Sequence, residues 1–178
     1  MFETLFREDL IVMNSAAANR EEALAELAEK LRANNYVHAS FAQAVLHREE
    51  EFPTGLPTNP VGVAIPHTDI EHVISPAIAV SIVATPVQFN EMGNPDNQVD
   101  VRIIFMLAVN SPHMQLDLLK QLISRISDAN SLTSLLHAQN KQEVLQVMGA
   151  QPVNSTAREQ ELDFRIGVDG NIHGGSIP

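Results

Sequence analysis

Cysteine and tryptophan are both absent from this chain of 178 residues, and tyrosine occurs only once. The absence of cysteine excludes disulfides and thiolate metal sites. Aromatic residues make up only 4% of the chain, so we do not expect it to stack on exposed nucleic-acid bases. Hydrophobic residues make up 44%, which is enough for one domain of ordinary size with an aliphatic core.

Positive charge is also scarce, because 11 Lys and Arg stand against 22 Asp and Glu and the formal net charge is −11. This excess argues against a nucleic-acid backbone or an anionic membrane as a partner. The longest apolar run, 103–109, is far shorter than the ~20 residues that span a bilayer. Residues 1–9 are acidic and do not resemble a signal peptide. We therefore expect a soluble, cytoplasmic protein without direct membrane insertion.

The periodicity of apolar residues predicts helices that alternate with strands. The segment 99–109 is apolar on both faces, which is typical of a central strand covered by helices on both sides. The pattern as a whole indicates an α/β fold, with a mixed β-sheet sandwiched between helices on both faces. Helices are expected over 20–34, 40–50, 129–137, 140–148 and from Ser111-Pro112 onward, and strands over 61–65, 77–84 and 99–109.

Helix starts and buried faces can also be predicted. Asn19 with Glu22, and Ser40 with Gln43, have the spacing of a capping box, in which two side chains bond to the backbone N–H groups of a helix start. In the helix that opens at Ser111, helical spacing predicts a buried stripe. Its members are Leu116, Leu119, Ile123 and Ile126.

The composition changes after Gly149, where Pro, Asn, Ser and Gly become frequent. We expect one domain over 1–149 and a C-terminal appendage or tail over 150–178, because so short a piece cannot bury a core alone. Its only alternating apolar residues could form one added strand, or the tail could pack on a neighbour. They are Leu162, Phe164, Ile166 and Val168.

Ile65-Pro66-His67 closes an alternating apolar run. Proline fixes its own φ and has no N–H, so it ends the strand and places the histidine at a rigid edge. An unperturbed imidazole can act as a neutral nucleophile or carry a proton near pH 7. His67 is therefore the first candidate for chemistry, although a histidine at a strand end can also be purely structural.

Two further residues point to the same place. His113 lies in the first turn of a helix that follows the central strand, and parallel strands would bring it to the edge where His67 lies. Arg48 lies on the apolar side of its helix, which is unusual for an arginine without an anionic partner. Two histidines, an arginine and a helix N-terminus suit a phosphoryl group. Surface positions for His113 and Arg48 remain the alternative.

A metal site is the competing interpretation. His67, Asp69 and His72 form a short pattern that could supply zinc or iron ligands to a metal-dependent hydrolase. The other histidines show no convergent spacing and are interpreted as surface residues.

Three motifs resemble a known family. They are Arg48-Glu49-Glu50-Glu51-Phe52-Pro53-Thr54-Gly55, Gly62-Val63-Ala64-Ile65-Pro66-His67 and Asn110-Ser111-Pro112-His113. In order and spacing they resemble the fructose/mannitol superfamily of phosphotransferase-system (PTS) enzyme IIA domains, over roughly residues 1–148. The Phe-Pro-Thr-Gly run is most similar to the galactitol-type branch.

The resemblance implies a phosphocarrier with a mixed sheet flanked by helices. His67 would accept a phosphoryl group from phosphorylated HPr and pass it to a sugar-specific IIB component. His113 would be the second active-site histidine and Arg48 the phosphoryl-binding arginine, with no cofactor and no metal. A regulatory protein of the same fold, whose phosphorylation state controls a target protein, is an open alternative, as is a structural domain without an active histidine.

Overall fold

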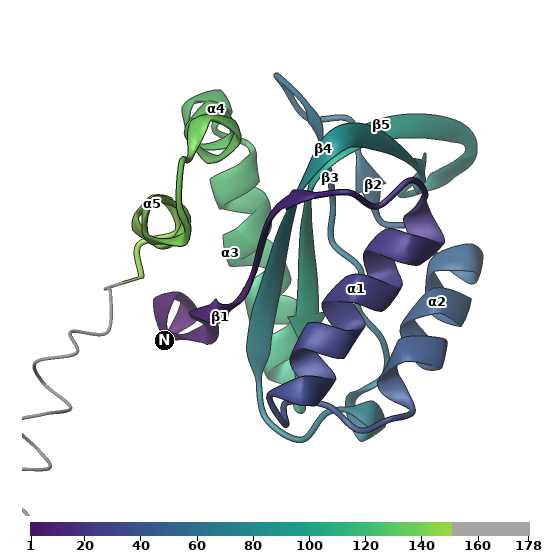
Figure 1. Ribbon diagram of the computed structural model, residues 1–178. Helices are drawn as coiled ribbons and strands as arrows, with labels where there is room; N and C mark the ends of the chain where they lie inside the picture. Colours follow the sequence, from purple (N-terminus) through teal and green to yellow (C-terminus); the bar gives the residue numbers. More distant parts are fainter. Residues whose placement is uncertain (151–178) are drawn as a thin grey trace, which may run out of the picture.

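The computed structural model of the chain describes residues 1–150 (Figure 1). Within them the strands are β1 (Phe6–Ser15), β2 (Gly55–Leu56), β3 (Gly62–Ala64), β4 (Ala77–Glu91) and β5 (Asn94–Ala108). The α-helices are α1 (Arg20–Ala33), α2 (Phe41–Glu51), α3 (Pro112–Ile126), α4 (Ala129–His137) and α5 (Lys141–Val147). Two 3₁₀ helices, η1 (Phe2–Leu5) and η2 (Ile70–His72), complete the described elements.

The centre of the sheet is the long antiparallel hairpin of β4 and β5. It turns at Met92-Gly93, where Gly93 has a φ of +77° that favours glycine. β1 runs parallel to β4, and β3 runs parallel to β5. The short β2 is antiparallel to β3, and its Gly55 also pairs with Glu91 near the hairpin tip. A Cβ on Gly55 would lie 2.6 Å from the Asn90 carbonyl oxygen, so only glycine fits this crossing.

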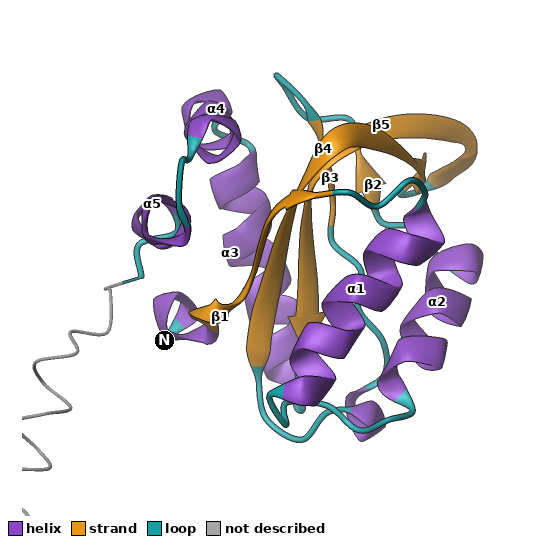
Figure 2. Cartoon of the chain, viewed as in Figure 1, coloured by secondary structure: helices purple, strands orange, loops and turns teal. Residues whose placement is uncertain are grey.

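Helices cover both faces of the sheet (Figure 2). On one face, α1 and α2 enclose a core with the inward side chains of β4 and β5. This core includes Leu27 of α1, Phe41 of α2 and Met106 of β5. On the other face, α3, α4 and α5 enclose a second core that includes Leu122, Leu132 and Phe105. The prediction of a mixed sheet between two helical layers is confirmed.

The expected helices all form, but not every local detail agrees. Asn19 caps α1 as predicted, accepting from the Glu22 N–H at 2.9 Å. The capping box at Ser40 is wrong, because its side chain makes no cap bond and its hydroxyl lies 2.8 Å from His72 Nδ1.

The predicted buried stripe of α3 is right at Ile126 but wrong at Leu116 and Ile123. The buried residues are Leu118, Leu122 and Ile126, whereas Leu116 and Ile123 are exposed. At 3.6 residues per turn, Leu116 and Ile123 lie on the side of the helix opposite Leu118, so the two sets cannot both face the sheet.

Four strands go beyond the prediction. β1 and β2 were not expected, β4 continues past residue 84 to Glu91, and β5 already begins at Asn94. No helix within residues 1–150 is long and apolar enough to cross a membrane. The predicted appendage lies, apart from Ala150, outside the described residues.

Candidate functional site

His67 follows β3 and is held by backbone contacts on two sides. The Leu107 N–H of β5 donates to the Pro66 carbonyl at 3.0 Å, and His67 pairs with Leu107 in a parallel bridge. On the other side, the Ile65 N–H donates to the Thr54 carbonyl at 3.3 Å. The sequence prediction of a histidine at a rigid strand end therefore describes this position well.

The ring of His67 is oriented by its own backbone. Nδ1 lies 2.9 Å from the Ile65 carbonyl oxygen. A carbonyl oxygen can only accept a hydrogen bond, so Nδ1 carries the proton and donates it. The lone pair of the neutral ring is then on Nε2, the nitrogen that points away from this bond.

The surroundings of His67 favour its uncharged form. Burial lowers the pKa of His67 below its usual value, and the positive charge of Arg48 lowers it further. The hydrogen bond to Ile65 and the Asp69 carboxylate act in the opposite direction without cancelling the effect. A nucleophilic Nε2 is therefore available at neutral pH.

Arg48 lies in the last turn of α2, and its positive charge lowers the pKa of His67. Its Nη1 is 3.4 Å from Asp69 Oδ1, and its Cζ is 5.1 Å from the centre of the Phe52 ring. The aromatic face stabilises a cation beside it. Arg48 thus pairs with a residue two positions after His67, and the charges of Arg48 and Asp69 act on the pKa of His67 in opposite directions.

Glu49, the next residue of α2, is a component that the sequence analysis missed. It is only 2% exposed and accepts from the Thr54 N–H at 2.8 Å and, through its other oxygen, from the Thr54 hydroxyl at 2.9 Å. Burial raises its pKa to about 7, against the opposing effects of the Thr54 hydrogen bonds and Arg20. Its position four residues after the buried Val45 was the available signal, because i and i+4 share a helix face.

His113 lies in the first turn of α3, where Ser111 caps the helix by accepting from the Met114 N–H at 3.4 Å. β3 and β5 are parallel, so the chain leaves both strands at the same end of the sheet, where α3 begins (Figure 2). The structure thus places the start of α3 at the His67 edge. The side chain of His113 is exposed.

The residues of the alternative metal site have other partners. Asp69 pairs with Arg48, while His72 Nδ1 contacts Ser40 Oγ and His72 Nε2 lies 3.5 Å from Glu71. Over residues 1–150, no group of three or more His, Cys, Asp or Glu side chains could hold a metal ion. The structure therefore gives no support to a hydrolase that uses His67, Asp69 and His72.

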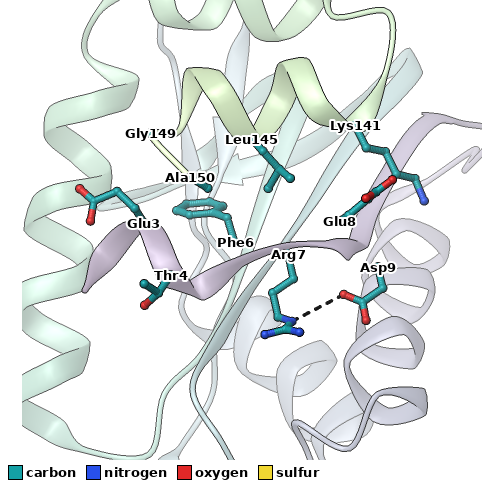
Figure 3. A pocket seen from close by; sticks show the side chains of 10 residues that line it. All are labelled: Glu3, Thr4, Phe6, Arg7, Glu8, Asp9, Lys141, Leu145, Gly149 and Ala150. Carbon is teal, nitrogen blue, oxygen red and sulfur yellow. Dashed lines mark ion pairs between the residues drawn. The ribbon is translucent and has the colours of Figure 1, made fainter. Parts of the chain in front are cut away.

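A cavity of about 670 Å³ lies elsewhere, between β1 and α5 (Figure 3). Its charged lining is mixed, and Arg7 and Asp9 pair across 3.8 Å within it. None of the candidate residues lines it. The lining residues are Glu3, Thr4, Phe6, Arg7, Glu8, Asp9, Lys141, Leu145, Gly149 and Ala150.

An uncharged imidazole with a free Nε2 can accept a phosphoryl group, and a guanidinium can stabilise the charge of that group. The comparison with known families agrees. The model of the phosphoenolpyruvate-dependent sugar phosphotransferase system EIIA 2 family matches residues 4–150. The chain belongs to this family of phosphotransferase components, which carry a phosphohistidine intermediate.

Individual relatives are consistent with the family. The chain is 32% identical over 118 residues to the galactitol-specific EIIA component of Escherichia coli K12, covering 66% of this chain and 78% of that protein. Crystal structures of similar fold include the mannitol IIA of E. coli (26% identity, TM-score 0.66, 80% of this chain and 98% of that one). The nitrogen regulatory protein IIA-Ntr of Neisseria meningitidis is equally identical, at 26%, with a TM-score of 0.70 over 82% and 97% of the two chains.

Proposed function

We propose that His67 is the phosphoryl acceptor of this EIIA component. The observation that carries the proposal is the hydrogen bond from Nδ1 to the Ile65 carbonyl, which leaves the Nε2 lone pair free beside Arg48. The lowered pKa of His67 keeps the ring neutral, as a nucleophile requires.

In the proposed step, Nε2 of His67 attacks the phosphorus of a phosphohistidine donor in line. A new N–P bond forms as the donor N–P bond breaks, and that electron pair stays on the donor nitrogen. The reaction exchanges one N–P bond for another, so the protein has mainly to position the groups and stabilise charge. Arg48 and the free N–H groups at the start of α3 would bind the phosphoryl oxygens, and His113 would donate a further hydrogen bond.

The donor in this proposal is phosphorylated HPr and the acceptor is a sugar-specific IIB component, both in the cytoplasm. The similarity to a galactitol-specific EIIA component supports galactitol or a related sugar. One similar solved structure is a complex of the mannitol IIA of E. coli with phosphorylated IIB (25% identity, TM-score 0.67, 81% of this chain and 96% of that one). That structure supports a IIB protein as the partner.

A regulatory role is the second candidate, and the similarity to IIA-Ntr favours it. In that role the phosphorylated protein would control a target and would pass nothing to a IIB component. Transfer from the phosphorylated protein to a galactitol-type IIB component in a purified mixture separates the two roles, because only a sugar phosphocarrier completes it.

The test of the acceptor is a relay of enzyme I, HPr and phosphoenolpyruvate, with mass spectrometry to locate the label. We expect one phosphoryl group on His67 and none on His67→Ala. His137→Ala, which changes an exposed histidine of α4, is the matched control and should be labelled normally. A label that persists on a histidine in His67→Ala would refute the assignment.

A further inference from the structure

Arg48 lies between two anion positions. One is the Asp69 carboxylate, 3.4 Å from its Nη1. The other is Nε2 of His67, where the proposed function places a phosphoryl group. Asp69 is two residues after His67 in the chain, so the ion pair of Arg48 and Asp69 lies beside the segment that presents the imidazole. The charges of both side chains also act on the pKa of His67.

We propose that Asp69 is a displaceable counter-ion: Arg48 leaves it for the phosphoryl group, and the released carboxylate destabilises phosphohistidine 67. The inference rests on the proposed function and deepens it, because it assigns to Asp69 the tuning of the phosphoryl-transfer potential.

The ion pair between Arg48 and Asp69 is suited to exchange. The Arg48 side chain is 34% exposed and that of Asp69 is 69% exposed, and solvent screens such a pair strongly. A phosphoryl group carries up to two negative charges and three acceptor oxygens, so it binds a guanidinium more tightly than one exposed carboxylate does.

The backbone that carries Asp69 is held by contacts of its own. The His72 N–H donates to the Asp69 carbonyl at 3.3 Å, and the His38 N–H donates to the His72 carbonyl at 2.9 Å. Ser40 Oγ also contacts His72 Nδ1. These contacts do not involve Arg48, so the backbone that carries Asp69 stays in place when Arg48 leaves the carboxylate.

Both effects of Asp69 shift the phosphorylation equilibrium of His67 toward the unphosphorylated protein. Before phosphorylation, Asp69 stabilises the unphosphorylated protein by pairing with Arg48. After phosphorylation, its carboxylate repels the phosphoryl dianion on His67. Each lowers the equilibrium occupancy of phosphohistidine 67 and favours onward transfer. Glu71 is the other acidic side chain on this segment, and it is paired with His72 at 3.5 Å and not with Arg48.

The test compares two equilibrium constants in Asp69→Asn, a nearly isosteric change at an exposed position. We expect the constant for uptake from phosphorylated HPr to rise about 3- to 10-fold, the range for one unit charge near a partly exposed site. The constant for onward transfer to a IIB component should fall by the same factor, since the overall reaction from HPr to IIB does not involve the carboxylate. Glu71→Gln is the matched control and should leave both constants unchanged.

Other outcomes are decisive. Equal equilibrium constants in Asp69→Asn and the wild type overturn the proposal, as do slower rates without a change in equilibrium, which would indicate a role in positioning alone. Asp69→Asn should also raise the uptake constant of Arg48→Ala, but by a smaller factor than it raises that of the wild type. Without Arg48 there is no ion pair to lose, and only the repulsion between the carboxylate and the phosphoryl group is removed. If wild-type His67 takes no label, the proposed function itself fails.

Discussion

The two histidines of the candidate site differ in how the structure holds their side chains. His67 follows a strand, is oriented by a hydrogen bond to its own backbone, and is flanked by Arg48 and Asp69. His113 lies in the first turn of α3 with an exposed side chain. One side of the site is thus built before any partner binds, and the other is open to solvent.

This difference fits two roles, a nucleophile at His67 and a hydrogen-bond donor at His113. A nucleophile needs a fixed tautomer and a neutral ring, and the backbone supplies both to His67 without a partner. A hydrogen-bond donor that meets the phosphoryl group only in a complex does not need to be preorganised in the free protein. We therefore expect large losses from changes on the His67 side and smaller losses from changes at His113.

After the complete loss expected for His67→Ala, the largest effect is expected at Arg48. Arg48→Ala should reduce the rate of phosphoryl uptake by about 10²- to 10³-fold, because it removes the positive charge and the hydrogen-bond donors that bind the phosphoryl oxygens. It should also raise the pKa of His67, since the Arg48 charge holds that pKa down. Single-turnover labelling and an NMR titration of the imidazole measure the two effects.

Arg48→Lys separates the effect of the positive charge from the effect of the guanidinium geometry. Lysine keeps the charge but loses the planar pair of donors that binds two phosphoryl oxygens. The pKa of His67 should therefore remain near that of the wild type while the rate still falls. An Arg48→Ala protein with a wild-type rate would remove this side of the site from the mechanism.

A second prediction concerns Glu49, which supports the same side through Thr54. Its pKa is raised to about 7, so between pH 4.5 and 7 the folded state binds more protons than the unfolded state. The free energy of unfolding of the wild type should therefore fall across this range relative to Glu49→Gln, by about 3 kcal/mol in all.

Denaturant unfolding at pH 5 and pH 8 measures this difference. Glu50→Gln is the matched control, because Glu50 is the next residue of α2 and is exposed. Its pH dependence should equal that of the wild type. If Glu49→Gln shows the same pH dependence as the wild type, the carboxyl is not held at a raised pKa by burial.

Much of this architecture could be predicted because local signals agree with the fold. The apolar 99–109 segment, the Ser111 cap and the proline after Ile65 each define their element without help from distant residues. The outer half of β4 could not be predicted in this way. Pro86 breaks the pattern there, and the structure accommodates it where the pairing with β5 slips between Ile82 and Val87.

β1 was missed for a related reason. Its run Arg7-Glu8-Asp9 interrupts any alternation of apolar side chains, and all three are exposed at the edge of the sheet. Charged edge residues are common because they prevent unwanted pairing, but they hide a strand from a periodicity analysis. The pairing of Arg48 with Asp69 was equally inaccessible, since it depends on how α2 packs against the segment after β3.

The smallest predicted effect is at His113 and tests the open side of the site. His113→Ala should lower the rate of phosphoryl transfer by about tenfold, the value of one hydrogen bond to a charged group that water partly replaces. His113→Gln retains a donor and should recover part of that loss, and neither change should alter stability, because the side chain is exposed. Single-turnover transfer and denaturant unfolding measure both. A loss as large as that of Arg48→Ala would mean that complex formation buries His113 against the phosphoryl group, and the contrast between the two sides would then hold only for the free protein.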